Sequence, residues 1–133
     1  MKIFQRTSTE KNSRGNRLNI IDENNVLVGY DFDTHCCEKL EYYFSVAEPD
    51  EDGVQYKIIE DSFDHEGYVF DPTYFSEYWS EPDDGHRDRR AVFKLVKPNK
   101  PTVYLTLRNY QNGYYSHGFE MFRGTVKIKE GEL

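Results

Sequence analysis

Two aspartates, a histidine and a cysteine occupy every second position of the stretch DFDTHCC, residues 31–37. If a strand continues through it, Asp31, Asp33, His35 and Cys37 share one face, because alternate side chains of a strand point the same way. Carboxylate, imidazole and thiolate groups bind divalent metals, so the set is a candidate site of a metal- or thiol-dependent enzyme. However, the four positions span more than about 10 Å at about 3.3 Å per residue, too far to converge on one ion without a bend. The preferred interpretation is a strand end, and we expect no cofactor.

The two cysteines of the chain, Cys36 and Cys37, are neighbours, and neighbouring strand residues point to opposite faces. We therefore expect reduced thiols in a cytoplasmic protein. A catalytic cysteine would need a base and an orienting acid. The histidines that could serve, His65, His86 and His117, each lie in a polar or turn-like context. We predict small buried thiols and no catalytic residue.

Acidic residues concentrate in the middle of the chain. Residues 48–88 contain 14 acidic and two basic residues, whereas the remainder contains 10 acidic and 15 basic residues, and the net charge is −7. Nucleic-acid phosphates would repel this segment, so we expect no direct nucleic-acid binding. The charge would instead speed association with a basic protein. The alternative is a solvated loop face that keeps the protein in solution.

Aromatic residues are interleaved with these acids between residues 70 and 84. We expect residues 71–86 to be irregular and the segment 70–84 to lie outside the core strands. Tyrosine and tryptophan beside carboxylates are typical of a protein-binding surface, where the rings anchor the partner and the charges steer it. The alternative is a loop that folds its rings over an open end of the fold. The predicted partner-binding residues are Tyr74, Glu77, Tyr78, Trp79, Glu81, Asp83 and Asp84.

Short alternating runs separated by turn residues, with almost no helical periodicity, predict an all-β fold. We expect one domain, residues 1–133, built as an antiparallel β-sandwich or barrel of roughly nine short strands with little helix. The chain starts polar after four residues and has no apolar run of the about 20 residues that a membrane span needs, so we expect neither a signal peptide nor a membrane segment. Strands are expected near residues 1–6, 17–22, 25–32, 39–48, 54–61, 67–70, 89–97, 101–122 and 125–130.

The segment 101–122 is predicted to be a β-hairpin, because Asn112-Gly113 is a strong two-residue turn signal between alternating runs. Together with the tract THCCEKLEYYF, it resembles a family of small uncharacterised phage and bacterial proteins. That family carries an Asp-Cys-Cys-Glu strand near the front and an Asn-Gly-Tyr-Tyr-Ser hairpin near the end. The matching residues, about ten of 133, include Cys36, Cys37, Glu38, Asn112, Gly113, Tyr114, Tyr115 and Ser116, whereas His35 replaces the aspartate. The resemblance implies a mobile-element or bacterial-conflict setting and a small β fold.

These patterns favour a non-enzymatic acidic binding protein. The expected role is an immunity or inhibitor protein that neutralises a basic toxin or nuclease, or an acidic phage-encoded inhibitor of host defence. One alternative is a metal- or thiol-dependent enzyme that uses the 31–37 cluster. Another is a structural phage component.

Overall fold

The computed structural model describes residues 1–6, 15–33, 38–48, 58–81, 85–111 and 116–133. None of these residues is helical, and the all-β prediction is confirmed. Within these ranges there are eleven strands, where roughly nine were expected for the whole chain. They are β1 (Lys2–Arg6), β2 (Arg17–Ile21), β3 (Val26–Asp31), β4 (Glu38–Ser45), β5 (Ile58–Ile59), β6 (Val69–Phe70), β7 (Ser76–Ser80), β8 (Arg87–Val96), β9 (Val103–Gln111), β10 (Gly118–Arg123) and β11 (Val126–Glu132).

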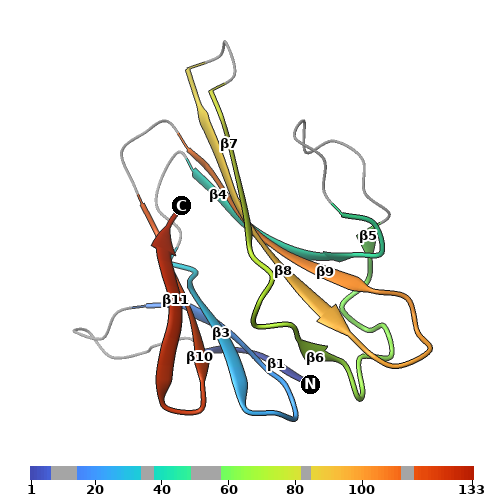
Figure 1. Cartoon of the computed structure of the whole chain (residues 1–133). Helices are drawn as coiled ribbons and strands as arrows, with labels where there is room; N and C mark the ends of the chain where they lie inside the picture. The colour runs from blue at the N-terminus through green and yellow to red at the C-terminus, as the bar shows by residue number, and fades with distance from the viewer. Residues whose placement is uncertain (7–14, 34–37, 49–57, 82–84, 112–115) are drawn as a thin grey trace.

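The strands form two antiparallel sheets that face each other as a sandwich (Figure 1). The five-stranded sheet has the order β1-β2-β3-β10-β11. The six-stranded sheet has the order β5-β4-β9-β8-β6, and β7 also pairs with β8. Because β11 and β7 are both outermost, one side of the sandwich presents two sheet edges.

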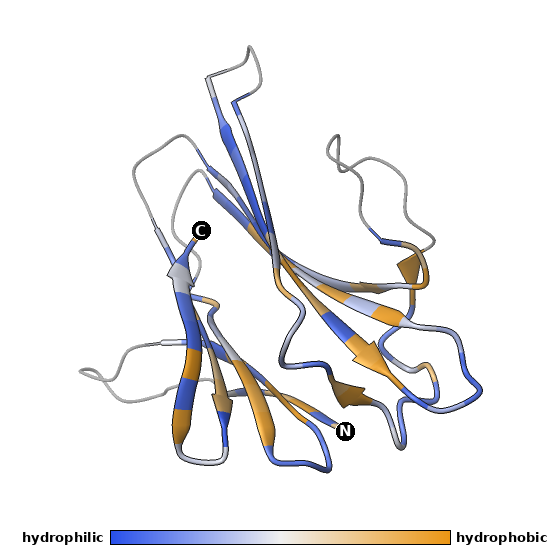
Figure 2. Cartoon of the chain, in the orientation of Figure 1, coloured by the Kyte–Doolittle hydropathy of each residue, from blue (hydrophilic) through white to orange (hydrophobic). Residues whose placement is uncertain are grey.

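Alternation along the strands produces the core between the sheets. Ala91, Phe93 and Leu95 of β8 are fully buried, and hydrophobic residues recur along the strands that meet there (Figure 2). Phe119 of β10 lies in the same cluster, and its ring centroid is 6.0 Å from that of Phe93. Apolar burial of this kind stabilises a fold by about 25 cal/mol per Å².

A buried carboxylate links the sheets at one end of the sandwich. Oδ1 of Asp22 accepts hydrogen bonds from the backbone N–H groups of Asn24 and Val26, each at 2.9 Å. Oδ2 accepts the N–H of Phe70 in β6 at 2.8 Å. Asp22 is 7% exposed, so it ties the β2–β3 turn to the second sheet away from water.

We expect Asp22→Ala to lower the free energy of unfolding by about 2–4 kcal/mol, because two buried N–H groups lose their acceptor. Asp22→Asn should cost less, since one carbonyl oxygen remains. The matched control is Glu23→Ala, whose carboxylate accepts the exposed N–H of Gly67. Urea unfolding of the three variants checks the prediction, and equal losses for Asp22→Ala and Glu23→Ala would contradict it.

Two predictions, that residues 71–86 are irregular and that the segment 70–84 lies outside the core strands, are wrong. Residues 76–80 form β7, which is antiparallel to β8, and Phe70 of β6 is buried. The adjoining Phe75 stacks on Phe119 with ring centroids 5.6 Å apart. Nearby prolines and acids obscure the alternation of this short strand, although its ladder partner β8 is the next strand along the chain.

The predicted hairpin at 101–122 is also wrong as a pairing. β9 pairs with β4 and β8, whereas β10 pairs with β3 and β11, so the two strands belong to different sheets. Asn112 and Gly113 lie outside the described residues. Alternating apolar residues identify both strands correctly, but alternation shows which face is buried and does not show which strand is the neighbour.

Candidate functional site

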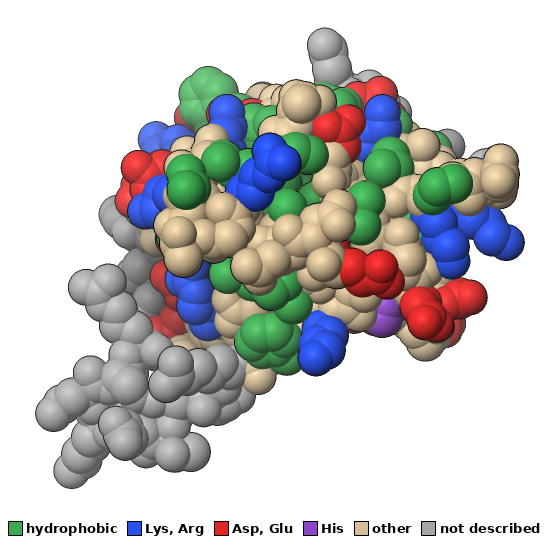
Figure 3. All heavy atoms as spheres, turned by 60° about the horizontal axis from the view of Figure 1, so that its bottom comes forward, with side chains coloured by type: hydrophobic (Ala, Val, Ile, Leu, Met, Phe, Trp, Pro, Cys, Tyr) green, Lys and Arg blue, Asp and Glu red, His purple; other side chains and the backbone are tan. Residues whose placement is uncertain are grey.

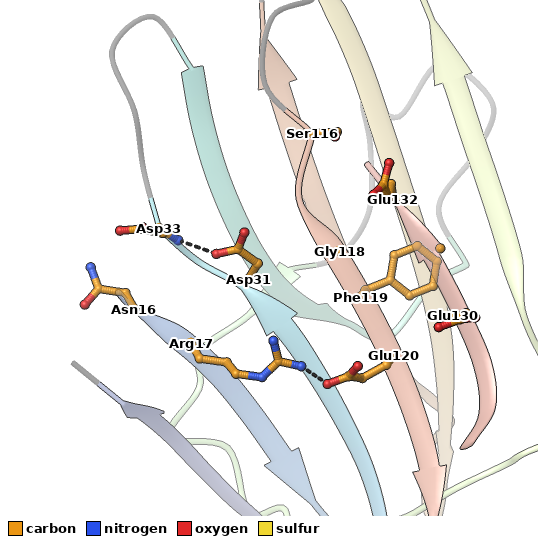
Figure 4. Close-up of a pocket in the computed structure, with 11 residues that line it drawn as sticks. Asn16, Arg17, Asp31, Asp33, Ser116, Gly118, Phe119, Glu120, Glu130 and Glu132 are labelled. Carbon is orange, nitrogen blue, oxygen red and sulfur yellow. Dashed lines mark hydrogen bonds and ion pairs between the residues drawn. The ribbon is translucent and has the colours of Figure 1, made fainter. Parts of the chain in front are cut away.

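A cavity of about 690 Å³ opens at the end of the five-stranded sheet where β3 ends (Figure 4). Its lining brings together residues from β2, β3, β10 and β11 and the segments next to them. Five are carboxylates and one is a guanidinium. They are Asp31, Asp33, Glu120, Glu130, Glu132 and Arg17.

The strand register explains why the sheet is hollow here. Arg17 is paired with Asp31, and Gly118 is paired with Glu132. The pairing of β3 with β10 extends up to the residues next to Asp31 and Gly118, so these two positions are also neighbours. Arg17, Asp31, Gly118 and Glu132 therefore form one row across four strands. Gly118 has no side chain, so the carboxylates of Asp31 and Glu132 flank an empty position about 10 Å wide, twice the interstrand spacing. A Cβ added at Gly118 would meet only a backbone oxygen, at 3.9 Å.

A second row of paired residues closes one side of the cavity. Gly29 is paired with Glu120, and Glu120 is paired with Glu130. The side chain of Arg17 crosses over Gly29 to form an ion pair with Glu120 (Figure 4). A Cβ at Gly29 would lie 2.7 Å from Nη2 of Arg17, so this glycine makes room for the crossing.

Among the described residues, cations pair with only some of the cavity carboxylates. Arg17 forms an ion pair with Glu120, and Nζ of Lys127 lies 2.9 Å from Oε2 of Glu130. The side chains of Asp33 and Glu132 form no hydrogen bond or ion pair within the described part of the chain. At the opposite end of the sandwich, which comes forward in Figure 3, basic and acidic side chains are interspersed. The cavity is therefore a local concentration of negative charge.

A buried histidine lies directly behind the cavity. Nδ1 of His117 is 3.1 Å from Oδ2 of Asp31, and Nε2 is 2.8 Å from Oε2 of Glu38 in the other sheet. His117 is 1% exposed and the side chain of Glu38 is fully buried, whereas that of Asp31 is 41% exposed. The imidazole therefore connects a cavity carboxylate to a carboxylate in the core of the sandwich.

Tyr30 adds to this polar region without ionising. Burial, assisted by the negative charges of Glu38 and Asp31, raises the pKa of Tyr30 far above its ordinary value. The neutral hydroxyl donates a hydrogen bond to the backbone oxygen of Arg108 at 3.2 Å. This ring therefore fills the core beneath the cavity and supplies no charge to it.

The predicted metal or thiol cluster is described only in part. β3 ends at Asp31, and Oδ1 of Asp31 accepts the N–H of Asp33 at 3.1 Å, a local turn bond typical of a strand end. His35, Cys36 and Cys37 lie outside the described residues. In the part of the chain that is described, no three histidine, cysteine, aspartate or glutamate side chains are grouped as metal ligands.

The predicted partner-binding residues separate into two groups. Trp79 is 59% exposed, and Glu77 and Glu81 are exposed beside it. Tyr78 is half-buried on the opposite face of β7. Asp83 and Asp84 lie outside the described residues.

Tyr74 packs within the protein. Its half-buried ring meets that of Tyr104 edge-on at 5.8 Å, and its hydroxyl donates a hydrogen bond to Glu48. Trp79 is thus the predicted aromatic anchor that is most available to a partner.

Trp79 and the acidic cavity adjoin each other. A second, shallower cavity of about 320 Å³ lies between β7, β8 and the end of β11, and its lining includes Trp79, Arg89 and Glu132. The guanidinium carbon of Arg89 is 5.8 Å from the centroid of the Trp79 ring. Because Glu132 lines both cavities, the exposed ring and the carboxylates form one surface, which we call the β7–β11 surface.

Sequence reasoning missed Glu120, Glu130, Glu132 and the role of His117. The carboxylates of the cavity come from β3, β10 and β11, so a count of charge along the chain could not group them. The alternation of Glu130 and Glu132 in the last strand was the one available signal, because it places both on the same face.

Comparison with known proteins found no matching family model, curated protein or solved structure. The described ranges contain no long apolar helix of the kind that crosses a bilayer.

Proposed function

We propose that this protein is a non-enzymatic binding protein that holds a basic protein partner on the β7–β11 surface. The observation that carries the proposal is the continuity, through Glu132, of a cavity with five carboxylates and an exposed tryptophan. Exposed carboxylates speed the encounter with a basic protein, and a large aromatic ring supplies contact area once the two meet.

The cavity suits a lysine or arginine side chain of the partner. Asp31 and Glu132 flank the empty position at Gly118, and Asp33 adds a third carboxylate. A cationic head group between these carboxylates would form charge-assisted hydrogen bonds, which are stronger than neutral ones.

This role predicts a basic toxin or nuclease as the partner. If the protein is encoded by a phage, the partner is a nuclease of the host defence. Such enzymes carry cationic surfaces because their substrates are polyanions. An acidic protein that covers such a surface blocks access of the nucleic acid. The protein is therefore expected to inhibit the partner by occupying its nucleic-acid-binding surface.

We expect Gly118→Val to weaken partner binding at least tenfold while leaving the fold intact. Valine would fill the hollow between Asp31 and Glu132, and there is space for it, since the nearest atom to a new Cβ is 3.9 Å away. Valine also suits a strand better than glycine does. The measurement is capture from host lysate on immobilised wild-type and variant protein, followed by titration of the purified basic partner.

The matched control is Glu66→Gln, an exposed carboxylate at the end of the sandwich opposite the cavity. It should retain the partner as the wild type does. If Gly118→Val keeps its melting temperature and still binds the same basic protein with unchanged affinity, the cavity is not the binding site.

A further inference from the structure

We propose that the partner binds by adding an extended strand to the free edge of β7, with two basic side chains flanking an apolar one at alternate positions. This inference rests on the proposed function and specifies how the partner is held. It concerns β7 itself, whereas the proposed function depends on the acidic cavity.

The first observation is the edge of β7 that has no neighbouring strand among the described residues. β7 pairs with β8 along residues 76–80, and no other described strand pairs with it. An unpaired edge presents backbone donors and acceptors that another strand can use, and such addition is a common mode of peptide recognition. Protein edges are normally protected by charged side chains, lysine above all, by proline, by bulges or by being short. β7 is short and has one charged side chain, that of Glu77. β11, at the edge of the other sheet, has Lys127 and Lys129 and a bulged ladder, whereas β7, SEYWS, has no lysine, proline or bulge.

The side chains of this edge define a pattern. Glu77, Trp79 and Glu81 occupy alternate positions, so their side chains are expected on one face. On the β8 side, Ala91 is opposite Glu77 and Arg89 is opposite Trp79. A strand on the free side would face the same three residues.

Cross-strand neighbours of opposite charge, and aromatic residues opposite β-branched ones, stabilise a sheet. The complementary strand therefore has lysine or arginine opposite Glu77 and Glu81, and an apolar residue between them opposite Trp79. Glu81 already lies 3.4 Å from Nε of Arg87, but its side chain is 53% exposed and open to a second cation.

The same pattern disfavours a second copy of this chain as the occupant. An antiparallel pair of β7 strands centred on Trp79 would place Glu77 of each copy opposite Glu81 of the other. Like charges directly opposite destabilise a sheet. Glu132 adds further negative charge beside this edge, so a basic segment is the complementary occupant.

The test uses the blocked peptide TKTITKT and the charge-reversed peptide TETITET. Trp79 is the single tryptophan of the chain, so its fluorescence reports binding at the site. We expect TKTITKT to bind at least tenfold more tightly than TETITET. The double substitution Glu77→Lys with Glu81→Lys should reverse this preference.

Backbone pairing is tested separately with N-methylated peptides. Alternate N–H groups of a strand point to the same edge, so TKTITKT methylated on its lysine and isoleucine nitrogens and TKTITKT methylated on its threonine nitrogens should differ. One of the two should lose binding at least tenfold and the other should not. Equal effects of both, or no fluorescence change with TKTITKT at millimolar concentration, would overturn strand addition.

Binding at the cavity and strand addition at β7 predict different results for the two variants. If Gly118→Val loses the captured partner while Glu77→Lys with Glu81→Lys retains it, the partner binds at the cavity and strand addition is wrong. If the peptides behave as expected and Gly118→Val still captures the partner, the edge is the site and the cavity is not.

Discussion

Replacing His117 with alanine should lower the free energy of unfolding by about 3–5 kcal/mol, because the fully buried carboxyl group of Glu38 then loses one of its partners. Nε2 of His117 lies 2.8 Å from the fully buried carboxylate of Glu38, and the ring itself is 1% exposed. The backbone N–H of His117 bonds to the oxygen of Leu133, and its oxygen accepts the N–H of Leu133, both at 2.9 Å. These backbone bonds survive the substitution, so the loss reports the side chain. Urea unfolding is the measurement.

Two further variants show whether the buried pair is responsible. Asp31→Asn should cost less than about 1 kcal/mol, since the Asp31 side chain is 41% exposed and solvent compensates part of its charge. His117→Leu combined with Glu38→Leu should recover most of the loss, because both members of the buried polar contact are then replaced by apolar groups. A loss below about 1 kcal/mol for His117→Ala would contradict the account.

Replacing Trp79 with alanine should weaken partner binding by about 2 kcal/mol or more, which is about thirtyfold, and mainly by faster dissociation. The ring is 59% exposed, so the melting temperature should change little. Neutralising Glu77, Glu81, Asp83 and Asp84 to glutamine or asparagine should instead slow association, most visibly at low salt, because salt screens exposed charges within about 10 Å at 0.1 M. Stopped-flow mixing or surface plasmon resonance with the purified partner separates the two rates.

Phe4→Ala is the matched control for the loss of an exposed ring. Phe4 is 48% exposed and lies on β1, which is at the edge of the five-stranded sheet opposite to β11. It should bind the partner as the wild type does. If Trp79→Ala unfolds the protein, its ring supports the fold. If it binds with unchanged rates, the partner contacts another surface.

The sequence predicted most of the described strands, β7 excepted, because each of the buried ones shows its own alternation. Ala91, Phe93 and Leu95 of β8 are fully buried, as their spacing indicates, and Val26 and Val28 are buried in β3. The sandwich follows from many such strands with turns between them. Alternation does not show which strand is the neighbour. For this reason the strands before and after Asn112 were wrongly predicted to pair with each other.

The candidate site was less predictable, because it depends on those neighbours. Some carboxylates of the acidic middle segment are used inside the fold. Asp88, for instance, forms ion pairs with Arg90 and Arg108 at 2.8 and 3.0 Å. The acidic cavity instead draws its charge from residues before and after that segment. Trp79 was found because a large ring among acids is a local signal.

The bridges at Asp22 and His117 have a consequence for how one sheet sits on the other. The hydrophobic effect has no directionality, so it holds two layers together without selecting one relative position as sharply as hydrogen bonds do. Directional bonds do select one, and this sandwich has them at both ends: Asp22 to Phe70 at one, His117 to Glu38 at the other. A layer pinned at two separated points can neither shift nor pivot. Trp79 and Glu132 belong to different layers, and their spacing is therefore already fixed before a partner binds. Binding then requires little additional ordering of this surface, which lowers its entropic cost.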